Sequence, residues 1–292
     1  MQKSVLTVDR FEIPYMLFGE GPHLLICVNG MQQTMASWRS LVRHFAGTSY
    51  RVALFDFPNQ GRARCLHGSA CVGILEQVGV LGAVADTLSP DAPVALIGGS
   101  WGAVVAAAYA ARRPPRVRRL VLGSFQVRPN ARLREVARLG RSLVAAGRGD
   151  ELGEVFVGTF GAHLPPPRQR SIVAQFAALR AEQFQQMFEH AERLVNEEDV
   201  DSVADLRAIH AETLIVNGGA DPIVDAVDTE TLRRIPGAEL RVVANVGHFL
   251  HVEQPAILET YAEFLHRDLP DGAAAGSAAN DDRQGVRSAS LA

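Results

Sequence analysis

Short apolar runs, many of them rich in β-branched residues, recur along this chain of 292 residues. Runs of this kind, bounded by glycine, proline and polar residues, are typical of buried strands. We expect eight strands, at residues 5–8, 14–18, 24–28, 51–57, 94–97, 120–122, 213–216 and 240–243. Between them, apolar positions at helical spacing predict helices over residues 37–45, 75–88, 103–111 and 255–266. Two early strands followed by strand–helix alternation predict an α/β fold, with a mostly parallel eight-stranded sheet, an antiparallel start and helices on both faces.

The alternation stops between residues 127 and 210, where the pattern favours helices alone. One apolar stripe there follows the spacing i, i+3, i+4, i+7: Phe184, Met187, Phe188, Ala191 and Leu194. We therefore expect a helical cap, residues 127–210, inserted between two segments of the core, residues 1–126 and 211–268. Most of the stripe should pack on the core, while part of its apolar surface could line a pocket. Residues 269–292 are small, polar and aperiodic, which predicts a disordered tail.

A serine lies between a predicted strand and a predicted helix, in the run Gly98-Gly99-Ser100-Trp101-Gly102. A serine at such a turn adopts strained backbone angles, and the glycines remove the Cβ atoms that would clash. Its hydroxyl then projects above the sheet, beside the positive end of the helix that follows. The pattern Gly-x-Ser-x-Gly also occurs by chance, and glycine-rich turns also serve packing alone. The context of strand, turn and helix favours Ser100 as a nucleophile.

A serine nucleophile needs a base, usually an imidazole that a carboxylate orients. Asp221 follows the predicted strand 213–216 and a glycine turn, and His248 follows the strand 240–243. Both therefore lie just beyond the carboxyl end of a strand, where open α/β sheets bind ligands. The chain order Ser100, Asp221, His248 is also the order in which this kind of triad occurs in α/β folds with a serine elbow.

Other residues compete for these roles. Asp225 and Asp228 are close to Asp221 but fall in a predicted helix, where a solvated surface position is the ordinary expectation. Asp56 lies near the top of the sheet, and we favour turn-stabilising hydrogen bonds over catalysis for it. His251 could pair with His248 on a metal, but two histidines without further ligands make a poor zinc site. We expect His251 to be a packing or surface residue, and no metal.

Negative charge on a reacting carbonyl oxygen needs preorganised donors. The backbone N–H of Trp101, directly after the serine, is one candidate. The second should come from the loop after the third strand, where Met31 is the most plausible donor and Gly30 would let the loop approach the ligand.

The formal net charge of −3 argues against nucleic acid as the main partner. The longest apolar stretch, residues 103–111, is well short of the ~20 residues that cross a bilayer, so no stable membrane insertion is expected. The first residues lack the apolar segment of a signal peptide. Three cysteines, Cys27 in a strand and Cys65 and Cys71 in a loop, have no paired spacing and indicate reduced thiols in the cytoplasm.

A basic run, residues 112–119, ends the helix after the serine. Its ordinary interpretation is a solvated helix end whose positive charge complements the helix dipole. A sharper hypothesis is that the run docks an acidic carrier protein.

The assembled elements resemble the α/β-hydrolase superfamily from the first strand to about residue 265. Within it, several segments are similar to the RhlA/PhaG-type branch of 3-hydroxyacyl-carrier-protein acyltransferases. They are Val28-Asn29-Gly30, residues 34–38, Leu54-Phe55-Asp56-Phe57-Pro58, Ser100-Trp101-Gly102, Ala162-His163-Leu164-Pro165 and the histidine segment 247–255. The acid turn departs from that branch, since it has Asp221-Pro222-Ile223-Val224 in place of Asp-Glu-Tyr-Thr.

The resemblance implies acyl-thioester substrates, carried by a carrier protein or CoA, and an acyl-serine intermediate. It also implies transfer to a hydroxyl or thiol, with Ser100, Asp221 and His248 as the triad. We expect no cofactor beyond pantetheine carried by the substrate. A thioesterase or carboxylesterase is the close alternative, and a non-catalytic ligand-binding protein is a remote one. The candidate substrate-binding residues are Asn29, Gly30, His163, Phe184 and Phe249.

Overall fold

The computed structural model describes residues 1–196 and 200–269. Each of the eight predicted strands is present, and eight strands form the sheet in the order β1-β2-β4-β3-β6-β7-β8-β9. The first two pair antiparallel, β2 pairs antiparallel with β4, and the pairs from β4 onward are parallel, as predicted. One further strand, the two-residue β5, pairs with β2 beside this path and was not predicted. The strands are β1 Gln2–Val8, β2 Phe11–Phe18, β3 His23–Val28, β4 Tyr50–Phe55, β5 Arg64–Cys65, β6 Val94–Gly99, β7 Val117–Gly123, β8 Glu212–Gly218 and β9 Glu239–Val243.

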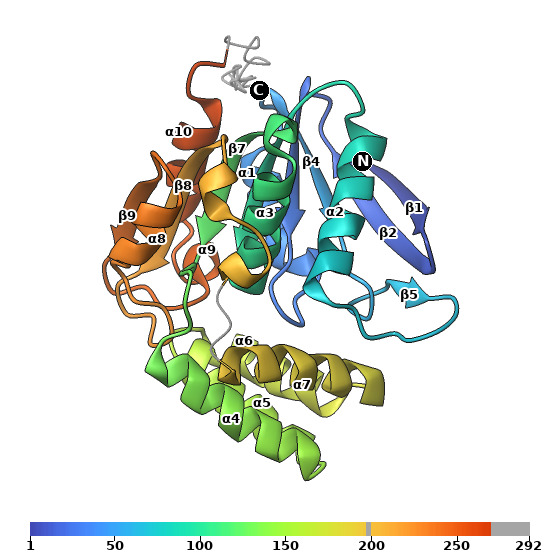
Figure 1. Cartoon of the computed structure of the whole chain (residues 1–292), viewed down its shortest axis with the longest axis vertical. Helices are drawn as coiled ribbons and strands as arrows, with labels where there is room; N and C mark the ends of the chain where they lie inside the picture. The colour runs from blue at the N-terminus through green and yellow to red at the C-terminus, as the bar shows by residue number, and fades with distance from the viewer. Residues whose placement is uncertain (197–199, 270–292) are drawn as a thin grey trace, which may run out of the picture.

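Helices cover both faces of the sheet (Figure 1). One face packs on α2 and α3 and the other on α1 and α10, and each face has its own buried apolar core. The core helices are η1 Met35–Trp38, α1 Arg39–His44, α2 Ile74–Leu88, α3 Trp101–Arg112, η2 Pro114–Arg116, η4 Leu206–Ala208, α8 Thr229–Arg234, α9 Leu250–Glu253 and α10 Ile257–His266. A helix was expected to contain Asp225 and Asp228. It begins only after Asp228, whose carboxylate caps its first turn by accepting from the Glu230 N–H at 3.0 Å.

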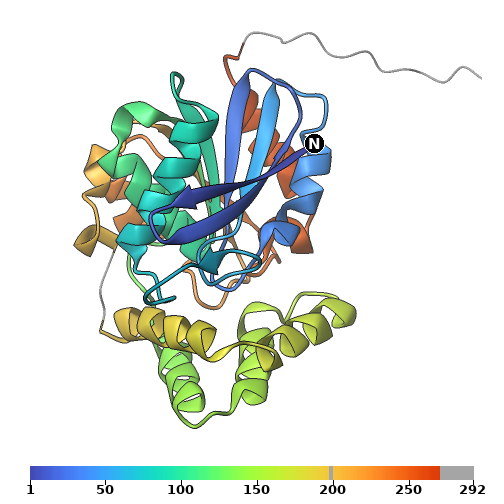
Figure 2. The ribbon, with the colours of Figure 1, turned by 90° about the vertical axis from the view of Figure 1, so that its right-hand side faces the viewer.

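A helical insertion follows β7, as predicted, and forms a layer below the carboxyl ends of the strands (Figure 1). Its helices are α4 Ala131–Ala145, α5 Gly149–Phe160, α6 Pro166–Ala177 and α7 Ala181–Val195, with η3 Val200–Ser202 before the return to β8. In Figure 2, α7 lies under the α2 and α3 side of the sheet and α6 under the α1 and α10 side. The cap therefore lies over the carboxyl ends of the strands and reaches the helix layers on both faces of the sheet. The predicted tail lies outside the described residues, apart from Leu269.

The basic run 112–119 is in part the solvated helix end that was expected, since Arg112, Arg113 and Arg118 are exposed, but two of its arginines are held within the protein. Arg116 donates to the backbone carbonyls of Ser89 and Ala92 at 2.7 and 3.0 Å, and it pairs with Asp86 at 3.0 Å. Arg119 is completely buried and donates to the Phe264 carbonyl. The run also lies at the far end of α3 from Ser100, about 18 Å along a twelve-residue helix.

Of the cysteines, Cys27 lies buried in β3 as expected, whereas Cys65 belongs to β5 and not to a loop. All three are free thiols. Across the part of the chain that the structure describes, none of the helices has the length and apolar character needed to cross a membrane.

Candidate active site

The turn between β6 and α3 is held in a conformation that requires its glycines. Ser100 has φ 54° and ψ −122°, a left-handed backbone that side chains rarely adopt, and its N–H donates to the Gly123 carbonyl at 2.8 Å. A Cβ at Gly98 would lie 2.5 Å from the Gly102 oxygen, and a Cβ at Gly102 would lie 2.2 Å from the Val28 oxygen. The backbone contacts leave no room for larger residues, and Ser100 lies at the apex of the turn as predicted.

The ends of β8 and β9 bring Asp221 and His248 together. The Asp221 Oδ2 and His248 Nδ1 atoms are 2.7 Å apart, and both side chains are buried. The other Asp221 oxygen accepts the Ile223 N–H at 3.0 Å, which fixes the orientation of the carboxylate. With Nδ1 engaged, His248 has Nε2 left for another partner. Asp225 instead accepts from the Asn130 side chain at 3.1 Å.

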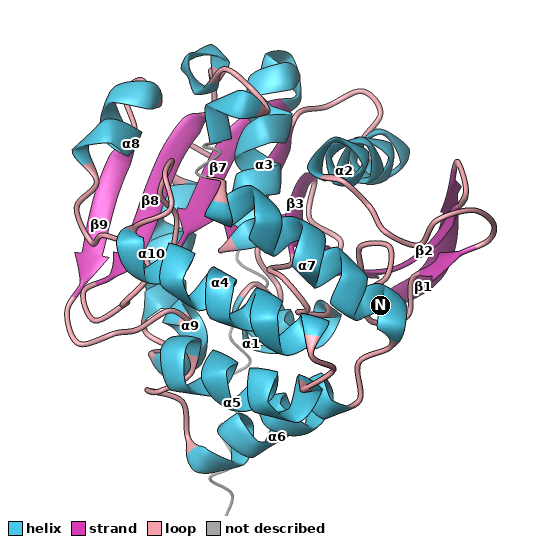
Figure 3. Cartoon of the chain, turned by 60° about the horizontal axis from the view of Figure 1, so that its bottom comes forward, coloured by secondary structure: helices cyan, strands magenta, loops and turns pink. Residues whose placement is uncertain are grey.

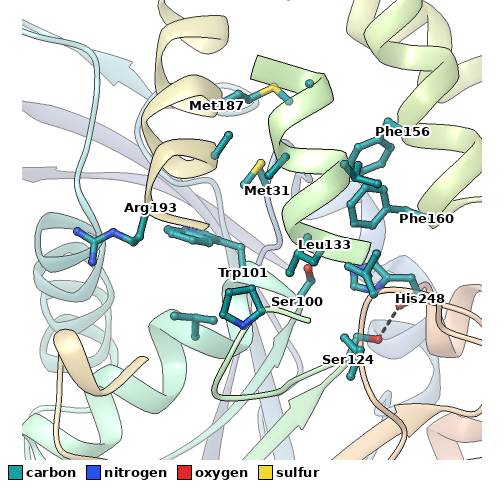
Figure 4. A pocket seen from close by; sticks show the side chains of 18 of the residues that line it. Met31, Ser100, Trp101, Ser124, Leu133, Phe156, Phe160, Met187, Arg193 and His248 are labelled. Atoms are coloured by element: carbon teal, nitrogen blue, oxygen red, sulfur yellow. Dashed lines mark hydrogen bonds between the residues drawn. The ribbon is translucent and has the colours of Figure 1, made fainter. Parts of the chain in front are cut away.

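Two side chains that the sequence did not single out hold the loop of His248. Glu253 accepts the N–H groups on either side of it, from Gly247 at 2.6 Å and from Phe249 at 2.9 Å. Ser124, which follows β7, donates its hydroxyl to the His248 carbonyl at 2.8 Å (Figure 4). The Ser124 contact joins residues 124 positions apart, so no local pattern signals it. Glu253 is close in sequence, and a carboxylate five residues after the histidine was its only signal.

We expect Glu253→Gln to lower kcat by about 10–100-fold with a smaller change in KM, because a small displacement of a catalytic imidazole lowers the reaction rate by about this factor. A glutamine oxygen can accept only one of the two N–H groups, and its NH₂ group would face the other. Kinetics with a p-nitrophenyl ester would measure the effect, together with thermal unfolding of the variant. Glu259→Gln on α10 is the matched control, since that side chain is 72% exposed and remote from the loop. Equal kinetics for the two variants would contradict the role of Glu253.

The loop after β3 passes close to the serine turn. A Cβ at Gly30 would lie 3.0 Å from the Gly99 oxygen, and Met31 lines the same pocket as Ser100. Within residues 1–196 and 200–269, no hydrogen bond to a carbonyl or side chain uses the N–H of Met31 or of Trp101. Both candidate donors therefore have their N–H groups available to a ligand. The Gln175 side chain of α6 donates to the Gln32 carbonyl at 2.6 Å and ties this loop to the cap.

Asn29 lies buried beneath this loop and stabilises it through hydrogen bonds. The expectation that it contacts substrate was wrong. Its side chain is completely buried and donates to the Phe55 carbonyl at 2.8 Å, while its oxygen accepts from the Trp38 indole at 2.8 Å. Asp56 accepts the N–H groups of Met35 and Arg62 at 2.8 and 3.1 Å. Asp56 therefore stabilises the turn, as expected. Burial raises the pKa of its carboxyl group, and this effect outweighs the hydrogen bonds, which lower the pKa.

Two cavities meet at Ser100 and His248. The first, about 170 Å³, lies on the α2 and α3 side and is lined mostly by apolar side chains (Figure 4). The second, about 490 Å³, lies on the α1 side, and more polar and charged side chains line it than line the first. Phe249 lines both of them. The apolar side chains around the first cavity come mainly from the cap, and they include Leu133, Val136, Leu152, Phe156, Phe160, Met187 and Phe188.

Two of the expected substrate-binding residues lie elsewhere. Phe184 packs within the cap, where its ring would lie 2.6 Å from a Cβ at Gly149, and it lines neither cavity. His163 is exposed and lies against Gly247, outside both linings. Met187, Phe188 and Ala191 of the apolar stripe do line the first cavity.

Two further histidines are buried beside tryptophans. The His190 ring of α7 stacks on the Trp101 indole with centroids 4.2 Å apart, and His251 stacks on Trp38 at 5.2 Å. Burial lowers the pKa of each to about 4, from 6.5. His251 is thus a packing residue, as expected, and contacts the Ser37 carbonyl at 3.4 Å.

These histidines predict a loss of stability in mild acid. Between pH 6.5 and about 4 the unfolded chain binds protons that the folded chain excludes, so the free energy of unfolding falls as the pH falls. Each histidine should account for about 2–3 kcal/mol by about pH 4.5. Urea unfolding at neutral and acidic pH, compared between the wild type and His251→Gln, would measure the contribution of His251 to this loss of stability. An unchanged pH dependence in the variant would contradict this account.

The model of a protein family described as "Alpha/beta hydrolase family" matches residues 25–259. The chain belongs to this family. Among curated alpha/beta hydrolase relatives, it is 26% identical over 235 residues to an (R)-3-hydroxydecanoyl-ACP:CoA transacylase from Pseudomonas aeruginosa, covering 80% of this chain and 77% of that one. It is 28% identical to a 2-hydroxy-6-oxo-2,4-heptadienoate hydrolase from Pseudomonas putida, covering 75% of this chain and 79% of the relative.

Among solved alpha/beta hydrolase structures, MGS-M2 from a Medee basin deep-sea metagenome library superposes with a TM-score of 0.78. The two chains are 20% identical, and the match covers 92% of this chain and 99% of the other. The likeness confirms the predicted alpha/beta hydrolase fold. The transacylase match confirms the expected resemblance to that branch of the family.

Proposed function

We propose that the protein is a serine acyltransferase that moves a medium-chain 3-hydroxyacyl group from a thioester to a second acceptor. One observation carries the proposal: an apolar cavity ends at Ser100, which shares it with a histidine bonded to a buried carboxylate. An acyl chain would lie in that cavity with its thioester carbonyl at the serine. The similarity to the transacylase supports a 3-hydroxyacyl thioester as the donor.

In the proposed reaction, His248 Nε2 takes the proton of the Ser100 hydroxyl as its oxygen attacks the thioester carbonyl carbon. The N–H groups of Met31 and Trp101 hold the negative oxygen of the tetrahedral intermediate. The carbon–sulfur bond then breaks, and the thiolate leaves with the proton from His248. An acceptor thiol or hydroxyl gives its proton to His248 and attacks the acyl-serine carbonyl, and the bond to the Ser100 oxygen breaks as His248 returns the proton to that oxygen. Asp221 holds the imidazole in the required tautomer throughout.

A thioesterase or carboxylesterase is a second candidate, in which water is the acceptor. The wider cavity beside Ser100, which polar and charged side chains also line, favours it, because water that enters there meets the acyl-serine. The similarity to the 2-hydroxy-6-oxo-2,4-heptadienoate hydrolase is also consistent with water as the nucleophile. A binding protein without turnover fits less well, because the carboxylate–imidazole pair beside the strained serine would then have no purpose.

Intact-mass spectrometry after exposure to 3-hydroxydecanoyl carrier protein distinguishes the candidates. We expect an acyl adduct that persists until CoA, or a second 3-hydroxyacyl thioester, is added. Rapid release of free acid without an acceptor would make the protein a hydrolase. If the protein forms no adduct and consumes no thioester, the proposal is wrong.

A further inference from the structure

The second cavity has a composition that the acyl chain does not explain. It opens at Ser100 on the α1 side of the sheet, and three arginines line it: Arg39 and Arg43 of α1 and Arg168 of α6. We propose that this cavity binds the phosphopantetheine arm of the thioester, with these three guanidinium groups contacting its phosphate. The inference rests on the proposed thioester substrate and adds where, and through which residues, the thiol carrier binds.

The arginines give this cavity charge of one sign. Among the described residues that line it there are three arginines but no aspartate or glutamate. Within residues 1–196 and 200–269, the three guanidinium groups also make no hydrogen bond or ion pair. Arg141 of α4, by contrast, is paired with Glu192 at 2.8 Å. Unpaired arginines that line one cavity suit a phosphate, which a guanidinium binds through two parallel hydrogen bonds.

The arginines come from two helices, α1 of the core and α6 of the cap. Arg39 and Arg43 are four residues apart on α1 and so share one face of that helix. On α6, the lining residues follow the spacing i, i+3, i+4, i+7: Arg168, Ser171, Ile172 and Gln175. One face of α6 therefore forms one wall of the cavity (Figure 3 shows α6 at the edge of the cap).

This face of α6 leads away from the reaction centre. Gln175, at its inner end, donates to the Gln32 carbonyl beside Met31. Arg168 is seven residues earlier, about 10 Å further out along the helix axis. A pantetheine arm has amide groups along its length and a phosphate at the end remote from sulfur. The polar side chains between Ser100 and Arg168 suit the amides, and the arginines suit the phosphate.

The two cavities would divide the substrate at its scissile bond. The apolar acyl chain lies on the α3 side, the polar thiol arm on the α1 side, and the carbonyl at Ser100. The phosphate belongs either to CoA or to the prosthetic group of a carrier protein. Both share the phosphopantetheine chemistry, so the experiment compares the two donors.

The test uses thioesters with and without the phosphate. We expect Arg168→Gln, and the double variant of Arg39→Gln with Arg43→Gln, to lower kcat/KM at least about tenfold for 3-hydroxydecanoyl-CoA or its carrier-protein thioester, mainly through KM. The N-acetylcysteamine thioester, which lacks the phosphate, should react unchanged. Arg170→Gln is the matched control, because Arg170 is exposed on α6 but outside the lining. A loss confined to one phosphate-bearing donor identifies the carrier.

Equal losses with all three thioesters, or none with either phosphate-bearing donor, would overturn the inference. If the wild type consumes no thioester, the proposed function fails, and the site is then tested through inhibition of p-nitrophenyl ester hydrolysis by CoA. Competitive inhibition that Arg168→Gln weakens and Arg170→Gln leaves unchanged would support the site. No inhibition of the wild type by millimolar CoA would overturn it.

Discussion

Replacing Ser100 by alanine is expected to lower kcat by about 10⁵–10⁶-fold and to abolish the acyl adduct. The proposed reaction forms its covalent bond at this hydroxyl, and without it only the oxyanion donors and substrate binding remain. The fold should persist, because alanine has the same Cβ as serine at the strained φ of 54° and keeps the N–H bonded to Gly123. Turnover of a p-nitrophenyl decanoate probe and intact-mass spectrometry would measure both effects.

Ser124→Ala is the matched control for this experiment. Ser124 lines both cavities as Ser100 does, but its hydroxyl is donated to the His248 carbonyl. We expect at most about a hundredfold loss of kcat from a slightly displaced histidine, with the acyl adduct retained. An adduct that survives Ser100→Ala and disappears with Ser124→Ala would assign the nucleophile to Ser124 instead.

The strands and the serine turn were predictable because their signals are local. A buried strand in a parallel sheet is an apolar run, and the sequence around Ser100 contains the glycines that its backbone contacts require. The pairing of Asp221 with His248 also followed, since both come directly after strands that lie side by side. The order of the residues in the chain and their positions after strand ends were sufficient to predict that the two side chains lie close together.

Side-chain direction and long-range contacts were not predictable in this way. The stripe of α7 showed one apolar face, but tertiary packing decides that Met187 faces the cavity while Phe184 packs inside the cap. The sequence around Asn29 is the same whether its side chain faces a ligand or accepts a hydrogen bond from the Trp38 indole, so the sequence alone could not distinguish the two. The burial of Arg119 within the basic run was missed for a related reason, because a charged side chain can be buried when a backbone carbonyl accepts its hydrogen bond.

Asp221→Asn is expected to lower kcat by about 10⁴-fold near neutral pH with little change in KM. The Ile223 N–H bonds one side-chain oxygen of Asp221, so an asparagine would keep its oxygen there and present its NH₂ group to His248 Nδ1. Nδ1 must then accept a hydrogen bond, which places the imidazole proton on Nε2. A protonated Nε2 cannot take the proton of Ser100, so the base is lost although the geometry is unchanged. Initial rates over a range of pH values, with the same ester probe, would measure the loss.

Asp225→Asn is the control, because Asp225 is exposed and bonded to the Asn130 side chain at 3.1 Å. It should retain kcat within about twofold, as surface substitutions commonly do. Urea unfolding of both variants separates a catalytic loss from a folding defect, since Asp221→Asn keeps the volume of the buried side chain. A loss of less than about tenfold in a folded Asp221→Asn would mean that His248 is held in its working tautomer by other contacts, and that the carboxylate is structural.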